Sequence, residues 1–470
     1  MKILSRLSTL LLASAMLAGP ALSAELRIGL QDDADVLDPA QSRTFVGRIV
    51  YTAMCDKLVD VSPDLKIVPQ LATEWAWSAD GKELTMKLRE GVKFHDDTPF
   101  NAAAVVATIE RNKTLPESRR KSELSSVEKV EATGDYAVKF TLKTPDVTLL
   151  AQLSDRAGMI VSPKAAAELG ANFGSKPVCA GPFKFVERIQ QDRIVLEKFA
   201  DYWDKDKVFI DKVTYLPIPD TTVRLANLRS GELDMIERLA ATDATSVKAD
   251  ESLTYADVVN IGYMALYVNI ANGARADNPF GKDKRLRQAF SLAIDREALN
   301  QVVYEGTAVG GNQPFPPNSP WFNKDLPVPA RDLEKAKALI KEAGFERVPI
   351  EMQIPNNPVA AQMMQIVQAM VAEAGFDVSL KTTEFATLLS EQTAGNYQLS
   401  RSDWSGRVDP DGNLHQFVTC EGGINDTKYC NPEVDTLLNE ARASTDDAVR
   451  KQKYDAAGKI LNEDLPVIYL

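Results

Sequence analysis

The amino-acid sequence predicts an α/β protein built as two lobes with a hinge between them. After residue 160, strand-like runs alternate with helix-like segments that begin at capping residues, which is typical of mixed sheets covered by helices. Between residues 70 and 150, alternating apolar residues such as Leu84, Met86 and Leu88 instead predict the hairpins of a smaller α+β subdomain. The length of 470 residues accommodates two or three domains.

The first 24 residues have the order of a secretory signal peptide. Lys2 and Arg6 precede a short apolar run at 7–18, and small residues follow up to Ala24. This run is shorter than the roughly 20 residues that span a bilayer. We expect cleavage after Ser23 or Ala24, and no lipid anchor because no Cys follows. The sequence therefore predicts a secreted protein.

The boundaries that we predict follow from this pattern. Residues 1–24 are the signal peptide, and the first lobe runs from 25 to 270. The smaller subdomain occupies about 65–160, and the second lobe spans 271–455. Residues 456–470 are expected to return to the first lobe. Extended segments that cross between the lobes are compatible with a hinge.

The chain is acidic. It has 54 Lys and Arg against 66 Asp and Glu, a net charge of −12, and loss of Lys2 and Arg6 leaves 52 against 66, near −14. This charge argues against nucleic acid or anionic lipid as a partner. It does not predict the charge of a ligand, because one cleft need not follow the global sum.

Four cysteines predict two disulfides, with free thiols as the alternative. Cys420 and Cys430 flank a turn-rich loop that brings them together, and Cys55 and Cys179 are then the remaining pair. A bridge closing a loop of about ten residues contributes on the order of 3 kcal/mol. The absence of a CxxC pair and the presence of only two histidines argue against a metal site.

Motifs of enzymes are missing from the sequence. It contains no GxSxG, HExxH, GxxxxGK[ST] or strand-linked GxGxxG pattern. His95 and His415 lie near no nucleophile pattern, and the Asp-Pro-Asp-Gly turn explains Asp409 and Asp411 without catalysis. We therefore predict a protein without catalytic residues or a cofactor. A secreted hydrolase with a hinge-bending fold is the alternative from another class.

Six segments, in order along nearly the whole mature chain, resemble one family. That family is the extracellular solute-binding proteins, family 5, which serve dipeptide, oligopeptide and nickel importers of the ABC type. The matching segments are WSADGKELTMKLREGVKFHDDTPFNA from Trp77, PVCAGPFKF from Pro177, NLRSGELD from Asn227, RLRQAFSLAIDR from Arg285, KAKALIKEAGF from Lys335 and WSGRVDPDG from Trp404.

The resemblance implies a periplasmic, monomeric binding protein of the large two-lobe type, with the subdomain at about 65–160 inserted in the first lobe. Such a protein encloses its ligand by lobe closure and delivers it to the transmembrane subunits of an ABC permease. The expected ligand is a peptide-like or other small polar solute, including an acidic one. A sensor or chaperone of the same fold is the alternative. The family continues some tens of residues past the position of Leu470, so a truncated C-terminus is expected.

Ligand-binding residues carry over from the family less directly. In dipeptide-binding members, an Asp shortly after a Trp-x-Gly turn holds the peptide amino group, and the position that resembles it here is Arg407. A guanidinium suits a carboxylate or phosphate instead. We therefore hypothesise that Arg407 binds an acidic group of the ligand. The alternative is that Arg407 supports its turn by pairing with Asp409 or Asp411.

Further candidates come from the same matched segments. Trp404 offers a flat apolar wall, and the backbone at Cys179, Ala180 and Gly181 begins a strand that could approach a ligand. The full set of predicted ligand-binding residues is Arg407, Trp404, Gly406, Asp409, Asn269, Cys179, Ala180, Gly181, Arg238 and Gln31.

Overall fold

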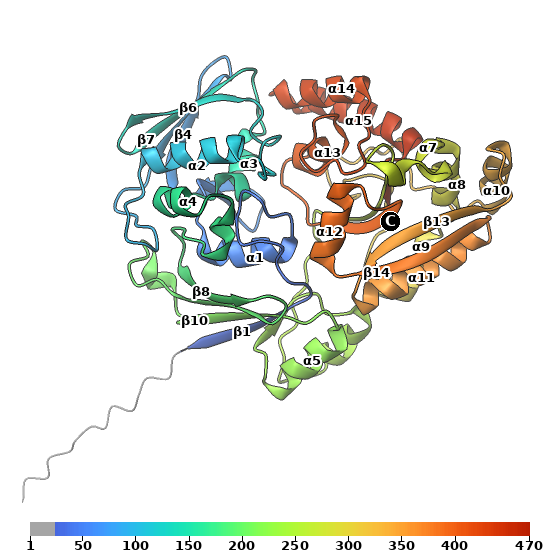
Figure 1. Ribbon diagram of the computed structural model, residues 1–470, viewed down its shortest axis with the longest axis horizontal. Helices are drawn as coiled ribbons and strands as arrows, with labels where there is room; N and C mark the ends of the chain where they lie inside the picture. The colour runs from blue at the N-terminus through green and yellow to red at the C-terminus, as the bar shows by residue number, and fades with distance from the viewer. Residues whose placement is uncertain (1–23) are drawn as a thin grey trace, which may run out of the picture.

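The computed structural model describes residues 24–470, so the predicted signal peptide lies almost entirely outside the described residues. Two five-stranded sheets organise this part of the chain, one in residues 24–262 and one in residues 263–470. We call these ranges the N-terminal part and the C-terminal part. They lie side by side, at the left and right of Figure 1. Within residues 24–470 no helix combines the length and apolar character needed to span a membrane.

The sheet of the N-terminal part has the order β11-β1-β10-β9-β8, with β1 parallel to β10 and β9 antiparallel to it. Helix α1 (Phe45–Met54) covers it, and Val50 and Tyr51 of the helix pack with Leu196 and Val213 of the strands. The strands are β1 (Glu25–Leu30), β8 (Phe183–Ile189), β9 (Arg193–Lys198), β10 (Lys212–Pro217) and β11 (Met235–Ile236).

The hairpins predicted between residues 70 and 150 form a separate antiparallel sheet of order β4-β5-β7-β6. Leu84, Met86 and Leu88 share one buried face, as the alternation predicted. Asn101 caps α2 (Ala102–Thr114) through its side chain, which accepts a hydrogen bond from the Ala104 N–H. The strands are β4 (Ala72–Trp77), β5 (Glu83–Leu88), β6 (Val127–Gly134) and β7 (Ala137–Leu142), and a smaller hairpin joins β2 (Val59–Val61) to β3 (Ile67–Pro69).

The sheet of the C-terminal part has the order β14-β13-β15-β12-β16 and is buried on both faces. Along β12, Leu266 and Val268 pack into the core under the helices of residues 284–372, whereas Ala265 and Tyr267 pack against the helices of residues 411–464. The strands are β12 (Tyr263–Val268), β13 (Val348–Pro355), β14 (Phe376–Thr383), β15 (Leu399–Trp404) and β16 (Val467–Tyr469).

The predicted boundaries differ from the strand pairing at two places. Residues 263–268 were expected in the first lobe, but β12 pairs antiparallel with β15 in the C-terminal sheet. Residues 456–470 were expected to return to the first lobe, but β16 pairs with β12. The reason is that an apolar run predicts a strand, whereas the sheet that this strand joins depends on which sheet has a free edge.

The helices begin where the sequence places capping residues. Asp283, Asp295 and Asp332 each accept a hydrogen bond from a first-turn N–H of the helix that they precede. The remaining helices are α3 (Leu149–Leu153), α4 (Pro163–Leu169), α5 (Thr221–Ser230), α6 (Ala244–Lys248), α7 (Pro279–Lys282), α8 (Lys284–Ala293), α9 (Arg296–Tyr304), α10 (Leu333–Glu342), α11 (Pro358–Ala372), α12 (Phe385–Ala394), α13 (Asp411–Val418), α14 (Pro432–Ala443) and α15 (Asp447–Asp464).

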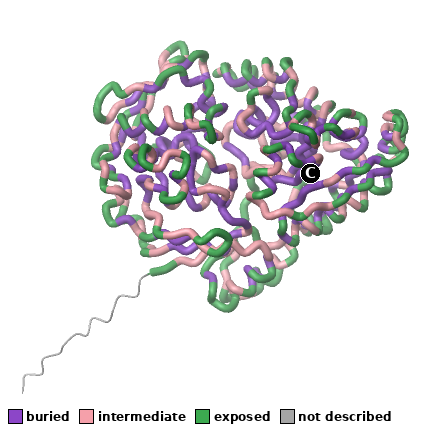
Figure 2. Tube along the Cα trace, viewed as in Figure 1, coloured by how far each residue is buried: buried purple, intermediate pink, exposed green. Residues whose placement is uncertain are grey.

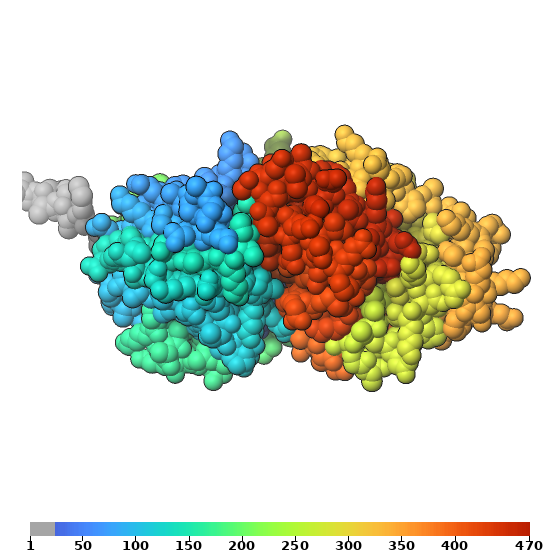
Figure 3. Space-filling view, turned by 90° about the horizontal axis from the view of Figure 1, so that it is seen from above, coloured from blue at the N-terminus to red at the C-terminus, as the bar shows by residue number. Residues whose placement is uncertain are grey.

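Both predicted disulfides are confirmed: Cys55 is bonded to Cys179, and Cys420 to Cys430. The buried residues gather inside each part and also along the boundary between them (Figure 2). Seen from above, the C-terminal segment lies directly against the N-terminal part (Figure 3). The two parts therefore meet over a buried interface rather than through a linker alone.

Candidate functional site

A cavity lies between the two parts of the chain. The N-terminal part contributes residues from 31–46 together with Arg120, Arg156 and Arg238. The C-terminal part contributes residues 401–405 and side chains from α12 and α13. A cavity of this kind, walled by both halves of a molecule, is the usual place for a small ligand.

Strand ends position the polar side chains of the cavity. Gln31 and Asp32 directly follow β1, while Arg401 and Asp403 lie on β15. Phe45 opens α1, whose N-terminus is capped by Thr44. Each half therefore presents rigidly held groups, and the cavity is complete only where the halves meet.

The wall of the cavity is rich in arginine. Four of its five arginines have a carboxylate partner: Arg43 with Asp426 at 2.7 Å, Arg120 with Glu123 at 2.5 Å, Arg238 with Glu237 at 3.3 Å and Arg401 with Asp403 at 3.0 Å. Throughout residues 24–470, Arg156 has no carboxylate oxygen within 4 Å. Its guanidinium donates only to the carbonyl of Thr44.

Like Arg156, the Asp32 carboxylate in the cavity wall forms no ion pair within residues 24–470. It is 7 % exposed, and no carboxylate–cation pair within 4 Å is formed by it in the described chain. Burial raises the pKa of Asp32 to about 6, and Arg238 is the main charge opposing that rise. The Asp32 carboxylate is thus buried, and the positive charge of Arg238 only partly offsets the cost of burying its negative charge.

Three of the predicted ligand-binding residues lie at this cavity: Gln31, Arg238 and Trp404. The ring of Trp404 packs edge-on against Phe417 at 4.8 Å, and its indole N–H donates to the side-chain oxygen of Asn413. Trp404 therefore combines a core contact with a place in the cavity wall.

Arg407 does not line the cavity, although the sequence singled it out. Its Nε lies 2.6 Å from Oδ2 of Asp155 in the N-terminal part, and its guanidinium stacks 4.0 Å from the Trp404 ring. Burial opposes ionisation of Asp155, but Arg407 and Arg48 outweigh it and hold the pKa of that carboxyl well below its usual range. Arg407 thus forms an ion pair between the two parts.

The alternative that Arg407 pairs with Asp409 or Asp411 also differs from the structure. Asp409 pairs with Arg450 at 2.7 Å, and Asp411 pairs with Arg442 at 2.7 Å. Both pairs form with helices that follow later in the chain. Nearness in the sequence gave the wrong partner here, because side chains in a turn can form ion pairs with elements that are far away in the chain.

The other predicted residues have structural partners away from the cavity. The amide of Asn269 donates to the carbonyls of Gly395 and Tyr397, which fixes the end of β12. Cys179 is in a disulfide, and Ala180 is fully buried. At Gly181 a Cβ would lie 2.4 Å from the Met54 backbone, so the glycine permits a close crossing. Gly406 (φ 80°) packs in the same way against Ile261.

His95 also has a structural role. Its Nε2–H donates to the carbonyl of Gly181 at 3.0 Å, and Nδ1 accepts from the N–H of Cys179. Burial lowers the pKa of His95 to about 4, so the ring is neutral near pH 7. Both ring nitrogens are used beside the Cys55–Cys179 disulfide. His95 therefore links the backbone of residues 179 and 181 beside this disulfide.

The sequence missed Arg120, Arg156 and Asp403 as residues of the cavity. Arg120 and Arg156 follow helices α2 and α3, in the stretch 103–176 that separates two matched segments. Asp403 immediately precedes the matched Trp404, and its alternation with Arg401 on β15 was the available signal.

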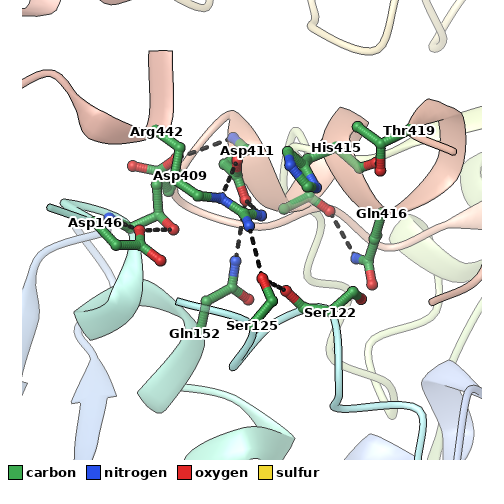
Figure 4. A network of polar contacts seen from close by, with 12 residues as sticks. Ser122, Ser125, Asp146, Gln152, Asp409, Asp411, His415, Gln416, Thr419 and Arg442 are labelled. Carbon is green, nitrogen blue, oxygen red and sulfur yellow. Dashed lines mark hydrogen bonds and ion pairs between the residues drawn. The ribbon is translucent and has the colours of Figure 1, made fainter. Parts of the chain in front are cut away.

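Next to the cavity, a polar network joins the two parts (Figure 4). Arg442 and Asp411 form a buried pair, and Gln152 and Ser125 of the N-terminal part bond to it. Ser122 accepts a hydrogen bond from the Gly423 N–H at 3.1 Å. These contacts join the N-terminal and C-terminal parts beside the cavity.

Two α/β parts around an enclosed polar cavity define a two-lobe binding protein. The profile of the bacterial extracellular solute-binding proteins, family 5, matches residues 66–425, and the chain belongs to this family. The fold is that of two-lobe periplasmic binding proteins.

Relatives and solved structures agree with this assignment. The chain is 30% identical to the glutathione-binding protein GsiB of Pectobacterium atrosepticum, covering 97% of this chain and 90% of that protein. It is also 30% identical to the dipeptide-binding protein of Escherichia coli strain K12, covering 86% and 81%. The periplasmic binding protein DppA from Helicobacter pylori, solved with the peptide STSA, superimposes with a TM-score of 0.87 at 26% identity, covering 95% and 92%.

Proposed function

We propose that this protein is the periplasmic substrate-binding component of an ABC importer, and that it captures a peptide-like or other small polar solute between its lobes. The carrying observation is the arginine-rich cavity that both parts enclose. The similar proteins support the class of ligand, since they are described as binding glutathione, dipeptides and a short peptide. The description of DppA as associated with an ABC transporter supports the partner, a permease.

Lobe closure supplies the physical basis of capture. Enclosing a solute removes water from it, so that each hydrogen bond and charge contact strengthens. The solute favours the closed state only by its higher affinity for that state. In this proposal the protein acts as a monomer in the periplasm, delivers the solute unchanged and makes or breaks no covalent bond.

The test uses the purified mature chain, beginning at residue 25. Solutes released by denaturation are identified by mass spectrometry, and the emptied protein is screened by thermal shift against dipeptides, tripeptides and glutathione. A solute at about 100 times its Kd should add about 2.7 kcal/mol to the free energy of unfolding. Its binding should also reduce the radius of gyration in solution scattering.

Two results would contradict the proposal. One is the absence of any retained or stabilising solute in the whole panel, together with scattering that never changes. The other is steady conversion of a bound solute into a product by the purified chain.

A further inference from the structure

The segment 404–407, which follows β15, separates two hollows at the boundary between the N-terminal and C-terminal parts. Trp404 and Ser405 line the cavity described above. Ser405, Gly406 and Arg407 line a second pocket, which residues of both parts also enclose. The contacts that fix this segment therefore also fix one wall of the cavity.

The side chain of Arg407 connects Trp404 to the N-terminal part. Its guanidinium lies 4.0 Å from the Trp404 ring, and its Nη1 donates a hydrogen bond to the Gly406 carbonyl at 2.7 Å. The Asn413 side-chain oxygen accepts hydrogen bonds from both the Arg407 N–H and the Trp404 indole N–H. Across the boundary, Nε of Arg407 lies 2.6 Å from Oδ2 of Asp155.

Arg48 of α1 makes this cluster unequal on its two sides. Its Nη1 lies 3.5 Å from Oδ2 of Asp155, and its Nη2 donates to the Ser405 hydroxyl at 2.6 Å. Asp155 and Arg48 belong to the same part, so they stay together when the two parts separate. Arg407 would instead lose Asp155, its carboxylate partner within 4 Å in residues 24–470.

Burial makes the position of this pair critical. The two side chains are 8 % and 9 % exposed. Burial lowers the pKa of Arg407 to about 9, although Asp155 opposes this effect. Among the cations that keep Asp155 ionised, Arg407 has the largest effect. A closed form in which the two side chains missed each other would bury both with less compensation, which is strongly unfavourable. The pair therefore favours one register of the two parts.

We propose that Arg407 is a positioning residue, which pairs with Asp155 to hold the two parts in one closed register and to place Trp404 in the cavity wall. This inference rests on the proposed function and concerns the regulation of its site. The pair consists of protein groups alone, so it should slow the release of every solute by the same factor. An Arg407 that bound the solute directly would instead distinguish solutes by their charge.

The first experiment measures release rates for two probes of different charge, Ala-Ala and glutathione. Each radiolabelled probe is bound to the emptied protein and chased with an excess of the unlabelled form. In Arg407→Met, closure still buries Asp155 but leaves it only Arg48 within 4 Å. Both probes should therefore leave about 10-fold faster than from wild type, since loss of one partner of a buried charge pair acts mainly on the rate of release.

The second experiment uses hydrogen exchange of the emptied protein and needs no solute. The N–H groups of Val147 and Gly423 each donate a hydrogen bond across the boundary at 3.1 Å, whereas the N–H of Val268 donates within the C-terminal part. Arg407→Met should speed exchange at Val147 and Gly423 by about 10-fold and leave Val268 unchanged, because the boundary alone opens more often.

Arg450→Met is the matched control. Arg450 is buried, its Nη2 lies 2.7 Å from Asp409, and its guanidinium lies 5.0 Å from the Trp321 ring, but all three residues belong to the C-terminal part. This variant should lower the free energy of unfolding and leave the release of both probes as in wild type. Circular dichroism verifies that each variant folds, and Arg407→Gln replaces Arg407→Met if the latter does not.

The outcomes separate the inference from the proposed function. A release rate that changes for one probe only, or equal exchange of Val147 and Gly423 in Arg407→Met and wild type, overturns the inference while the importer function stands. Equally fast release from Arg450→Met overturns it as well. If neither probe binds, the exchange measurement decides by itself. Scattering that changes with no solute of the panel contradicts the proposed function instead.

Discussion

Two buried polar regions lie at the same boundary between the N-terminal and C-terminal parts, and they differ in how completely their charges are paired. In the network of Figure 4, Arg442 makes two hydrogen bonds to the Asp411 carboxylate, which Gln152 also contacts. In the cavity beside it, Arg156 and Asp32 are also buried, but within residues 24–470 neither has an oppositely charged side chain within 4 Å.

This difference distinguishes charges whose burial is offset by an ion pair from charges whose burial is not. Removing one partner of a buried pair leaves the other uncompensated and is strongly destabilising. A charge that already lacks a partner destabilises the empty protein, and its removal should do the opposite. Replacing a charged residue by a neutral one should therefore lower the free energy of unfolding in the network and raise it in the cavity.

The largest expected effect is that of Arg442→Met. It leaves the fully buried Asp411 carboxylate without its cation, so the free energy of unfolding should fall by about 3–5 kcal/mol in urea denaturation. The exposed pair of Arg347 with Asp377 provides the control, and Arg347→Met should stay within error of wild type.

A second variant tests the reason for that loss. In Asp411→Leu/Arg442→Met both charges are removed together, and most of the lost stability should return. A double variant as unstable as Arg442→Met alone would show that the packing of the arginine, rather than the uncompensated carboxylate, caused the effect.

Asp32→Asn should change stability in the opposite direction. The pKa of Asp32 rises from 3.8 to about 6 on folding, so ionisation at pH 7 destabilises the empty protein by about 3 kcal/mol. The variant should therefore be more stable than wild type by that order at pH 7. Between pH 6 and 4 the folded wild type binds its proton more readily than the unfolded chain, so the advantage should shrink.

Urea denaturation of the ligand-free protein at pH 7 and at pH 4 measures this difference. Asp411→Asn, in the paired network, is the matched comparison and should lower the free energy of unfolding at pH 7, since the pKa of Asp411 is lowered in the folded protein by Arg442 against its burial. If both variants shifted stability in the same direction, the contrast between the two regions would be refuted.

The smallest effect is expected for Ser122→Ala. Its hydroxyl accepts a single neutral hydrogen bond from the Gly423 N–H across the boundary, and loss of such a bond lowers the free energy of unfolding by about 1 kcal/mol. Denaturation of the empty and ligand-saturated protein would locate the effect. A change seen only with ligand would mean that the two parts separate when the cavity is empty.

Local features of the fold could be predicted from the sequence. Capping residues after residue 160, such as Asp283 and Asp295, precede helices as the sequence predicts, because a cap acts on N–H groups two or three residues away. The alternation of Leu84, Met86 and Leu88 predicted a buried strand face, because successive side chains on a strand point to opposite faces of the sheet. Arg238 and Trp404, two of the three predicted residues at the cavity, lie near or within matched segments, whereas Gln31 does not.

What the sequence by itself determined is therefore the set of short-range patterns: strands, caps, the Cys420–Cys430 loop and the six segments that mark the family. The tertiary structure alone decided which distant groups meet: Arg407 with Asp155, β16 with β12, and Arg156 and Asp32 on one cavity. The physical reason is that pairing of charges and strands depends on distance in space, and chain separation leaves that distance open until the two parts have packed together.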